Sequence, residues 1–532
     1  MRRETLLGLI FVVAACAYLL ARLAPDVSGK PLHADEAVTG LVAARPFGEM
    51  LTTVLVERGG PPLHFVAAHV ALVLDPSADA LRWTSVAFAL GTVILCYDLG
   101  RRIAGPTAGA AAALVVATST ILGQLGTLGR MYAAFAFFAA LAADTFYRAL
   151  EQRTARTAVV AAVAAVLVAA THPFGLFIVV AEAVAGLALW RGRPLRPALP
   201  VFAVGLLLVP VLYASLRLSD RFGVGAGESS PLSSPRAALR EIHDAVAAFS
   251  GGHTVVLVFA LLVCAGIFLV ARQQPAFLAL LAAAVAPPLV YLVVSGSGTV
   301  ARSTRHLVYA LPLWAALIGA GLVLLAGRFP LAVQALLLAL VGVLGAGYQT
   351  KYAGDPRGVA TLNAATSNPA ALAGPAAWLR EHVTPDDVLF QYATPYLAAL
   401  DETQHATTIG PGPGGLLARG LDRVEFPASA VAVALQVAGS DVQSDELRAR
   451  LEDDAEVELT RRWLVIRQPG PFANEDELLL AAADVVGAAH ASTLSTPPRV
   501  EARIRGSFFV VCHALRQRSI ENAECSSTFP ED

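Results

Sequence analysis

The residues best suited to chemistry lie just after the first long apolar run. His33, Asp35 and Glu36 stand within four positions of one another. A carboxylate can remove the proton from a substrate hydroxyl group, and an imidazole can assist it or bind a polar substrate. Acidic residues also stabilise the first turn of a helix, by about 0.3 to 1 kcal/mol each, so a helix start is the alternative role. The acidic pair is therefore a candidate for activating a hydroxyl nucleophile.

Basic and aromatic residues form a second candidate group, at the starts of apolar runs and in the turns between them. Guanidinium groups bind phosphate oxygens two at a time, and imidazole exchanges protons near neutral pH. Charged groups near hydrocarbon cost about 2.5 to 3.5 kcal/mol each, so a cluster of them favours a lined cavity. The alternative roles are anchoring at lipid headgroups for the arginines and packing for the histidines. The group comprises His64, His69, Arg130, Tyr132, His172, Arg302, Arg305 and His306.

The composition indicates an integral membrane protein. Hydrophobic residues make up 56% of the chain and charged residues only 15%, which lies outside the range of soluble domains. The formal net charge of -2 provides no basic face, so nucleic acid is excluded as a partner. The five cysteines lack the spacing of a zinc site, although Cys512 and Cys525 could pair if their segment is exported. No cofactor is indicated with certainty, and a divalent metal is left open.

Apolar runs along the chain predict an α-helical polytopic membrane protein. About 20 apolar residues cross ~30 Å of hydrocarbon. The first run resembles a secretory or lipoprotein signal, but its length favours a retained helix. The stretch 61–74 is shorter and is expected to lie in the interface. The eleven predicted crossings are 5–24, 82–100, 108–127, 130–148, 157–171, 174–190, 197–216, 254–272, 276–295, 306–327 and 329–349.

The arginines orient these crossings. With a cytoplasmic N-terminus, twelve arginines lie inside and only Arg130, Arg302 and Arg305 lie in the short outer turns. Both candidate groups then face outward, whereas Asp98 and Asp144 lie near the cytoplasmic ends, where we expect them to balance neighbouring arginines. The twelve inner residues are Arg2, Arg3, Arg101, Arg102, Arg148, Arg153, Arg156, Arg191, Arg193, Arg196, Arg272 and Arg328.

An odd number of crossings exports the rest of the chain. Residues 1–350 are expected to form the membrane domain, with a first outer loop at 25–81, and residues 351–532 an extracytoplasmic soluble α/β domain. Within the latter, 410–414 (GPGPG) is interpreted as a linker. Helices are expected at 376–382 and 474–489, and strands at 388–390, 463–466 and 508–511.

Several motifs occur in a characteristic order along residues 1 to 350. They are DE in the first outer loop, PPL at the start of the interfacial segment, LRW at the next crossing, GRMYA, THPFGLF and RHLVYALP. This order resembles the bacterial GT-C glycosyltransferases, in particular the group related to protein O-mannosyltransferases, lipid A aminoarabinose transferases and RgtA/B/C/D-like enzymes. Such enzymes take a sugar from polyprenyl phosphate and transfer it to an acceptor outside the cytoplasmic membrane, usually with inversion.

The resemblance implies roles for individual residues. Asp35 would be the general base on the acceptor hydroxyl, with Glu36 beside it, and Arg130, Arg305 and His306 would bind the donor phosphate. His33, His64, His69, Tyr132, His172 and Arg302 would contact the acceptor or assist.

The sequence also departs from the family pattern at two of these positions. The lipid A group has an acidic residue where this chain has GRMY at 129–132, so no metal site is carried over. Arg305 is followed by His306 where the family often has tyrosine.

Two other classes of function compete with the enzyme. A transporter or flippase of a lipid-linked saccharide would have ionisable groups near the bilayer midplane and repeated halves. A membrane-anchored binding protein would need no polar cluster at the helix ends. The enzyme is favoured, with the lipid bilayer, a polyprenyl-phosphate donor and an extracytoplasmic acceptor as partners. The sugar, mannose or another hexose or pentose, and the acceptor, a protein, lipid or glycan, are not specified by the residues.

Overall fold

The computed structural model consists of two compact units. The first comprises Met1–Gly29 and Val42–Leu362, and the second Lys30–Leu41 and Asn363–Asp532. The structure describes residues 3–28, 34–58, 60–189, 208–216, 243, 246–249, 255–273, 277–278, 280–282, 285, 304–352, 387–390, 407–412, 415–419, 429–435, 456–459 and 463–469.

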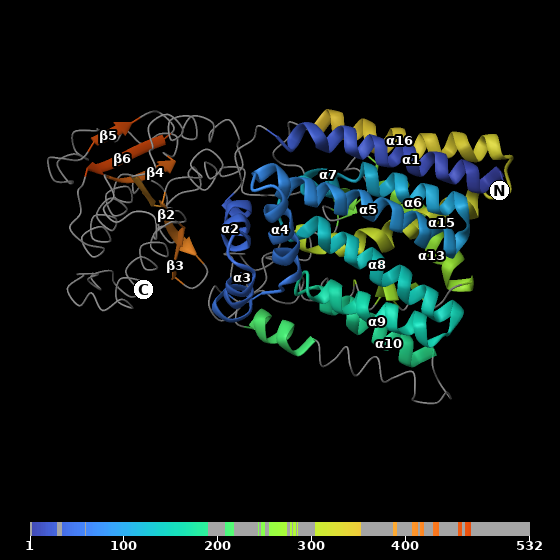
Figure 1. Ribbon diagram of the computed structural model, residues 1–532. Helices are drawn as coiled ribbons and strands as arrows, with labels where there is room; N and C mark the ends of the chain where they lie inside the picture. The colour runs from blue at the N-terminus through green and yellow to red at the C-terminus, as the bar shows by residue number, and fades with distance from the viewer. Residues whose placement is uncertain are drawn as a thin grey trace, which may run out of the picture. The chain divides into compact units, whose positions relative to one another are not determined.

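The first unit is helical (Figure 1). Five of its stretches are long and apolar enough to cross a membrane, namely Arg3–Asp26, Asp79–Ala104, Met131–Gln152, Val256–Gln273 and Arg305–Ala326. The chain is therefore a multi-pass membrane protein. The helices are α1 (Arg3–Leu23), η1 (Ala24–Asp26), α3 (Phe47–Thr52), η2 (Thr53–Arg58), α4 (Leu63–Leu74), α5 (Ala78–Ala104), α6 (Pro106–Thr118), α7 (Thr120–Leu125), α8 (Met131–Gln152), α9 (Ala155–Ala169), α10 (Gly175–Leu189), α13 (Val256–Gln273), η4 (Thr304–Ala310), α15 (Leu311–Ala326) and α16 (Leu331–Tyr352).

Five of the eleven predicted crossings coincide with these long helices, and the total number stays a prediction. The apolar helices α6, α9, α10 and α16 occupy four more of the predicted runs. Helix α4 has 12 residues, about 18 Å, which agrees with a segment too short to span. Much of 197–216 and 276–295 lies outside the described residues.

The expectation of one continuous helix over 108–127 is wrong. Helix α6 ends at Thr118 and α7 begins at Thr120, because Ser119 adopts an extended backbone (φ -65, ψ 138). The Ser119 hydroxyl accepts a hydrogen bond from the Leu122 N–H at 3.3 Å and donates to the Val116 carbonyl at 2.8 Å. Serine side chains compete in this way with helical hydrogen bonds and cap the next helix.

Helix α6 lies at the centre of the first unit. Every residue from Thr107 to Thr118 is buried, and the helix contacts α1, α5, α15 and α16. Its alanines and glycine allow neighbouring backbones to approach closely. At the crossing with α15, for example, a Cβ atom on Gly319 would overlap the carbonyl oxygen of Ala108. The apolar run of α6 is therefore buried by protein along its whole length.

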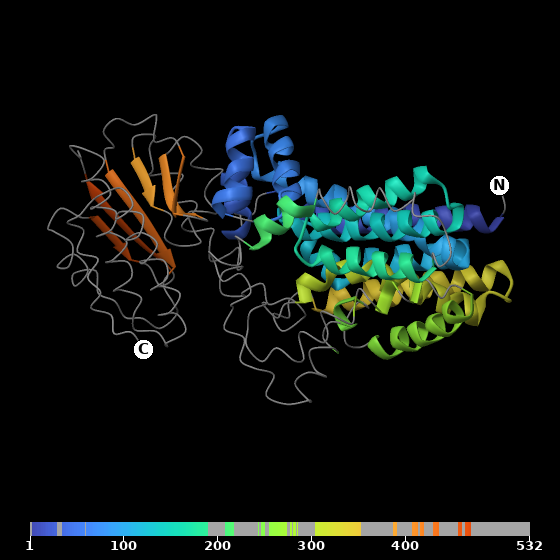
Figure 2. The same cartoon turned by 90° about the horizontal axis from the view of Figure 1, so that it is seen from below.

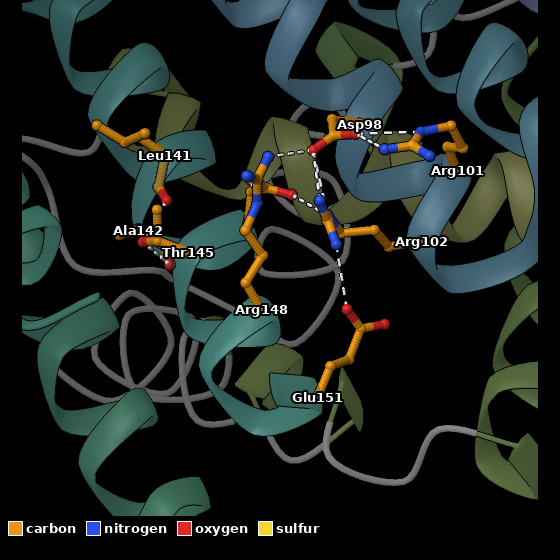
Figure 3. Close-up of polar contacts among 9 residues, drawn as sticks. Asp98, Arg101, Arg102, Leu141, Ala142, Thr145, Arg148 and Glu151 are labelled. Carbon is orange, nitrogen blue, oxygen red and sulfur yellow. Dashed lines mark hydrogen bonds and ion pairs between the residues drawn. The ribbon is translucent and has the colours of Figure 1, made fainter. Parts of the chain in front are cut away.

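An ion-pair network joins α5 to α8, which pack against each other (Figure 3). The Asp144 carboxylate lies 3.0 Å from Arg102 Nε and 2.9 Å from Arg148 Nε. Asp98 accepts hydrogen bonds from Arg102 at 3.1 Å and also from Arg101 and Arg148. Arg102 additionally pairs with Glu151 at 3.1 Å. The prediction that Asp98 and Asp144 balance neighbouring arginines is confirmed.

Replacing Asp144 with asparagine is expected to destabilise the protein by about 2 kcal/mol. Asp144 is 1% exposed, so its loss leaves two guanidinium groups without their buried counter-charge. The effect stays below the ~3 to 5 kcal/mol of fully buried pairs because Arg148 is 40% exposed. Thermal unfolding in detergent measures it, with Glu151→Gln as a control, since that 41% exposed carboxylate should contribute at most about 1 kcal/mol. Equal unfolding temperatures for both variants would contradict the buried role of Asp144.

The described part of the second unit includes a six-stranded sheet, whose strands lie side by side in Figure 2. The strand order is β3-β2-β1-β4-β6-β5, with β1 parallel to both β2 and β4 and the other pairs antiparallel. Helix α2 (Ala34–Ala43) begins in this unit. The strands are β1 (Asp387–Phe390), β2 (Thr407–Gly412), β3 (Gly415–Arg419), β4 (Ser429–Leu435), β5 (Glu456–Leu459) and β6 (Trp463–Pro469).

Strands β1 and β6 confirm the strands predicted at 388–390 and 463–466. The linker expected at 410–414 is wrong, because Gly410, Pro411 and Gly412 end β2 and pair with β3. Two residues separate these antiparallel strands, which is the length of a tight hairpin connection. The predicted elements at 376–382, 474–489 and 508–511 lie outside the described residues, as do Cys512 and Cys525. The extracytoplasmic α/β domain remains a prediction.

Candidate functional site

Three segments of the first unit bring the basic and aromatic candidates together. They are the start of α8, the turn between α9 and α10, and η4, which contacts α8. Arg130 immediately precedes α8 and has an extended backbone (φ -131, ψ 169), so the helix begins at the next residue. At the end of α9, Thr171 donates its hydroxyl to the Leu167 carbonyl at 2.7 Å. The turn that follows presents His172 toward η4.

The centre of this site is a pair of histidines. His172 Nε2 lies 3.1 Å from His306 Nδ1, although 134 positions separate the two residues in the sequence. His172 Nδ1 in turn accepts a hydrogen bond from the Phe174 backbone N–H at 3.1 Å. Both nitrogens of the His172 ring are therefore engaged by the protein.

Aromatic rings enclose the histidine pair. Phe135 stacks on His172 with centroids 4.6 Å apart and an interplanar angle of 16°. Phe174 meets the same ring edge-on at 5.4 Å. Tyr132 contacts His306 at 5.9 Å in a T-shaped arrangement. Such ring contacts restrict the orientation of both imidazoles.

Two arginines supply positive charge to the site. Arg130 is 8% exposed, and the Arg305 guanidinium carbon lies 5.6 Å from the centroid of the Tyr132 ring, within cation–π range. The buried Nε of Arg305 has no hydrogen-bond partner among the described residues. Burial holds the pKa of His172 well below its ordinary value, and the electrostatic influence of the neighbouring His306, Arg130 and Arg305 lowers that pKa further. These residues thus share one electrostatic environment, which we call the arginine–histidine cluster: Arg130, Tyr132, His172, Arg305 and His306.

The low pKa of His172 predicts a loss of stability in mild acid. An unfolded histidine has a pKa of about 6.5, so the unfolded chain binds this proton first as the pH falls. The contribution is fully present above that value and declines below it, by at most about 1.4 kcal/mol per pH unit. Thermal unfolding between about pH 7.5 and about pH 5.5 should show a shallower decline in His172→Gln than in the wild type. Parallel declines would contradict this prediction.

The other predicted residues have different positions. His64 is 7% exposed at the start of α4, and the adjacent Leu63 N–H donates to the Ala170 carbonyl at 2.9 Å, two residues before His172. His69 makes its contacts elsewhere: its Nδ1 lies 2.7 Å from the Ala43 carbonyl and its ring 5.5 Å from Phe47. His69 therefore connects α4 to the last residue of α2 and the first residue of α3. His33 and Arg302 lie outside the described residues.

Asp35 and Glu36 lie in the first turn of α2, which begins at Ala34. Their alternative role, stabilisation of the first turn of a helix, is therefore compatible with the structure, because a helix N-terminus favours negative charge at both positions. Glu36 is 2% exposed. A buried carboxylate is costly unless it is paired, so a purely solvent-facing role is excluded for Glu36.

Sequence reasoning missed two features of the first unit. Phe135 was not distinguished from the other apolar residues of its run, although it follows Tyr132 by three positions and so lies on the same helical face. Glu182 of α10 is 6% exposed, and its Oε1 has no hydrogen-bond partner among the described residues. The signal for Glu182 was available, because it is the one charged residue in the run 174–190.

Within the described parts of the chain, no group of three or more His, Cys, Asp or Glu residues could hold a metal ion.

Comparisons with known proteins agree with this architecture. A family model described as dolichyl-phosphate-mannose-protein mannosyltransferase matches residues 59–214, which include Arg130, Tyr132 and His172. Among solved structures, the apo form of ArnT from Cupriavidus metallidurans matches with a TM-score of 0.58 and 17% sequence identity, over 87% of this chain and 99% of that chain. The chain has the GT-C glycosyltransferase fold. The resemblance inferred from the order of the motifs is confirmed.

A second GT-C structure gives a similar match. ArnT from the same organism, bound to undecaprenyl phosphate, has a TM-score of 0.55 and 16% identity, over 87% of this chain and 99% of that chain. Among curated proteins, no sequence matches the chain. The matched family segment contains the PPL, LRW, GRMYA and THPFGLF motifs, whereas the acidic pair and the RHLVYALP segment lie outside it.

Proposed function

We propose that this GT-C protein transfers a sugar from a polyprenyl phosphate to an acceptor hydroxyl outside the cytoplasmic membrane, with inversion at the anomeric carbon. The observation that carries the proposal is the arginine–histidine cluster, formed by three separate segments within a GT-C fold. The match to a family named for a lipid-phosphate sugar supports the class of donor.

The cluster has the chemistry that a phosphate leaving group needs. As the bond between the anomeric carbon and the phosphate oxygen breaks, negative charge grows on the phosphate. Arg130 and Arg305 supply guanidinium donors in a largely buried environment, where such interactions are stronger than in water. His306 adds a ring N–H donor beside them. These groups would stabilise the departing polyprenyl phosphate.

The acceptor side requires a base. In a single displacement, the acceptor oxygen bonds to the anomeric carbon, its proton passes to a carboxylate, and the polyprenyl phosphate departs. We assign the proton to Asp35, with Glu36 as the neighbouring acidic group. His64, Tyr132 and His172 would contact the acceptor or assist the reaction.

The orientation belongs to the same proposal, with a cytoplasmic N-terminus and an extracytoplasmic C-terminal domain. A cysteine introduced at position 33 in a cysteine-free protein should then react with a membrane-impermeant reagent added to intact cells. Labelling only after the cells are opened would contradict this orientation.

Mass spectrometry of the cell envelope tests the function in the source organism. A deletion strain should lack one sugar on a glycan, lipid or protein of the envelope. The wild-type gene should restore that sugar, and a gene encoding Asp35→Asn at the same expression level should not. An unchanged set of envelope glycans in the deletion strain would contradict the proposal.

A further inference from the structure

We propose that His172 is a positioning residue that fixes His306 as an N–H donor to the phosphate of the sugar donor. Two hydrogen bonds carry the effect, from the Phe174 backbone N–H to His172 Nδ1 and between His172 Nε2 and His306 Nδ1. The identity of the ligand rests on the proposed function, whereas the protonation of the two rings follows from contacts within the protein.

The first step fixes the tautomer of His172. A backbone N–H can only donate, so the Phe174 N–H at 3.1 Å requires an unprotonated Nδ1 on His172. A neutral imidazole carries one proton, which must then reside on Nε2. A protonated, cationic His172 would place two N–H groups against each other at Phe174. It would also face the positive charges of Arg130 and Arg305.

The tautomer of His172 then determines the tautomer of His306. The Nε2–H of His172 points at His306 Nδ1 over 3.1 Å, so Nδ1 accepts the hydrogen bond and carries no proton. The proton of a neutral His306 therefore resides on Nε2, at the opposite side of the ring. The hydrogen bond made by one ring nitrogen thus sets the role of the other.

The surrounding aromatic rings maintain the hydrogen bonds of the two imidazoles. His172 is 4% exposed and is stacked on Phe135, and a ring flip, which exchanges each nitrogen with a ring carbon, would break both hydrogen bonds in a buried site. Tyr132 packs against His306 from the side of α8. These ring contacts favour one orientation of both imidazoles in the protein without ligand.

This tautomer of His306 favours binding of a phosphate ligand. A phosphate oxygen carries only lone pairs, so an unprotonated Nε2 on His306 would repel it, whereas Nε2–H donates to it. His172 need not touch the ligand to produce this effect. It acts through His306, and its contribution depends on whether residue 172 can donate a hydrogen bond.

Two substitutions of similar polarity separate this role from packing. The amide nitrogen of His172→Gln can reach the position of Nε2 and donate to His306. The amide oxygen of His172→Asn can replace Nδ1 and accept from Phe174, but this shorter side chain does not reach His306. We expect His172→Asn to weaken binding of undecaprenyl phosphate about tenfold or more, and His172→Gln to restore most of that affinity. If His172→Asn and His172→Gln had equal thermal stability and bound undecaprenyl phosphate with equal affinity, the proposal would be overturned.

Nitrogen NMR of the wild-type protein tests the tautomers without any substitution at position 172. In protein labelled with ¹⁵N-histidine and free of ligand, His306 should show a protonated Nε2 and an unprotonated Nδ1, with its signals assigned by their loss in His306→Gln. A protonated Nδ1 on His306 would overturn the proposal. Absence of sugar transfer by the same protein would instead contradict the proposed function, so the two failures are distinguishable.

Discussion

Replacement of Asp35 by asparagine is expected to slow sugar transfer by about 10²- to 10⁴-fold, the range for removal of a general base. Asparagine has nearly the same size but cannot accept the proton of the acceptor hydroxyl. The rate is measured with purified protein in lipid nanodiscs, a polyprenyl-phosphate sugar and the acceptor identified from the deletion strain. Binding of undecaprenyl phosphate should change little, because Asp35 is assigned to the acceptor and not to the leaving group.

The matched control for Asp35 is Glu49→Gln. Glu49 is an exposed carboxylate in the first turn of α3, within the same predicted outer loop. Its replacement removes the same charge and should leave the rate close to that of the wild type. A full rate in Asp35→Asn, or an equal loss in both variants, would remove Asp35 from the role of base.

Replacement of Arg305 should produce the second large effect, on the donor side. We expect Arg305→Ala to weaken binding of undecaprenyl phosphate by about 10- to 100-fold, as for loss of a hydrogen bond to a charged group. Arg305→Lys should recover only part of this affinity, because an ammonium group lacks the planar fork that binds two phosphate oxygens. Isothermal titration in detergent measures these affinities.

Arg328→Ala serves as the control for Arg305. Arg328 is exposed in the turn between α15 and α16, so it has the same charge without the enclosed environment. Its replacement should leave the affinity unchanged. If Arg305→Ala and Arg328→Ala bound undecaprenyl phosphate equally well, Arg305 would be an anchoring residue at the lipid headgroups.

The helices of the first unit were predictable because a membrane-spanning segment needs a long apolar run, and such runs are visible without any tertiary information. The break at Ser119 was not predictable from the run alone. Serine is tolerated within apolar helices, and only its extended backbone and its hydrogen bond to Leu122 identify it as a cap. Burial of α6 was equally hidden, since an alanine-rich helix can face lipid or protein.

The membership of the cluster was predictable and its internal geometry was not. Arg130, Tyr132, His172, Arg305 and His306 occur at the ends of apolar runs, so the topology alone gathers them on one side. The hydrogen bond between His172 and His306 depends on the packing of η4 against α8 and the turn after α9. The hairpin of β2 and β3 was missed for a related reason, because Gly and Pro occur both in linkers and at strand ends.

The most direct test of sugar transfer is the release of free undecaprenyl phosphate from an undecaprenyl-phosphate sugar by the purified protein. We expect ³¹P NMR to show conversion of the phosphodiester to the phosphomonoester when the acceptor is present, and Asp35→Asn to slow this conversion by about 10²-fold or more. A phosphodiester that persists with the wild-type protein, across the hexose and pentose donors and with envelope acceptors supplied, would contradict it.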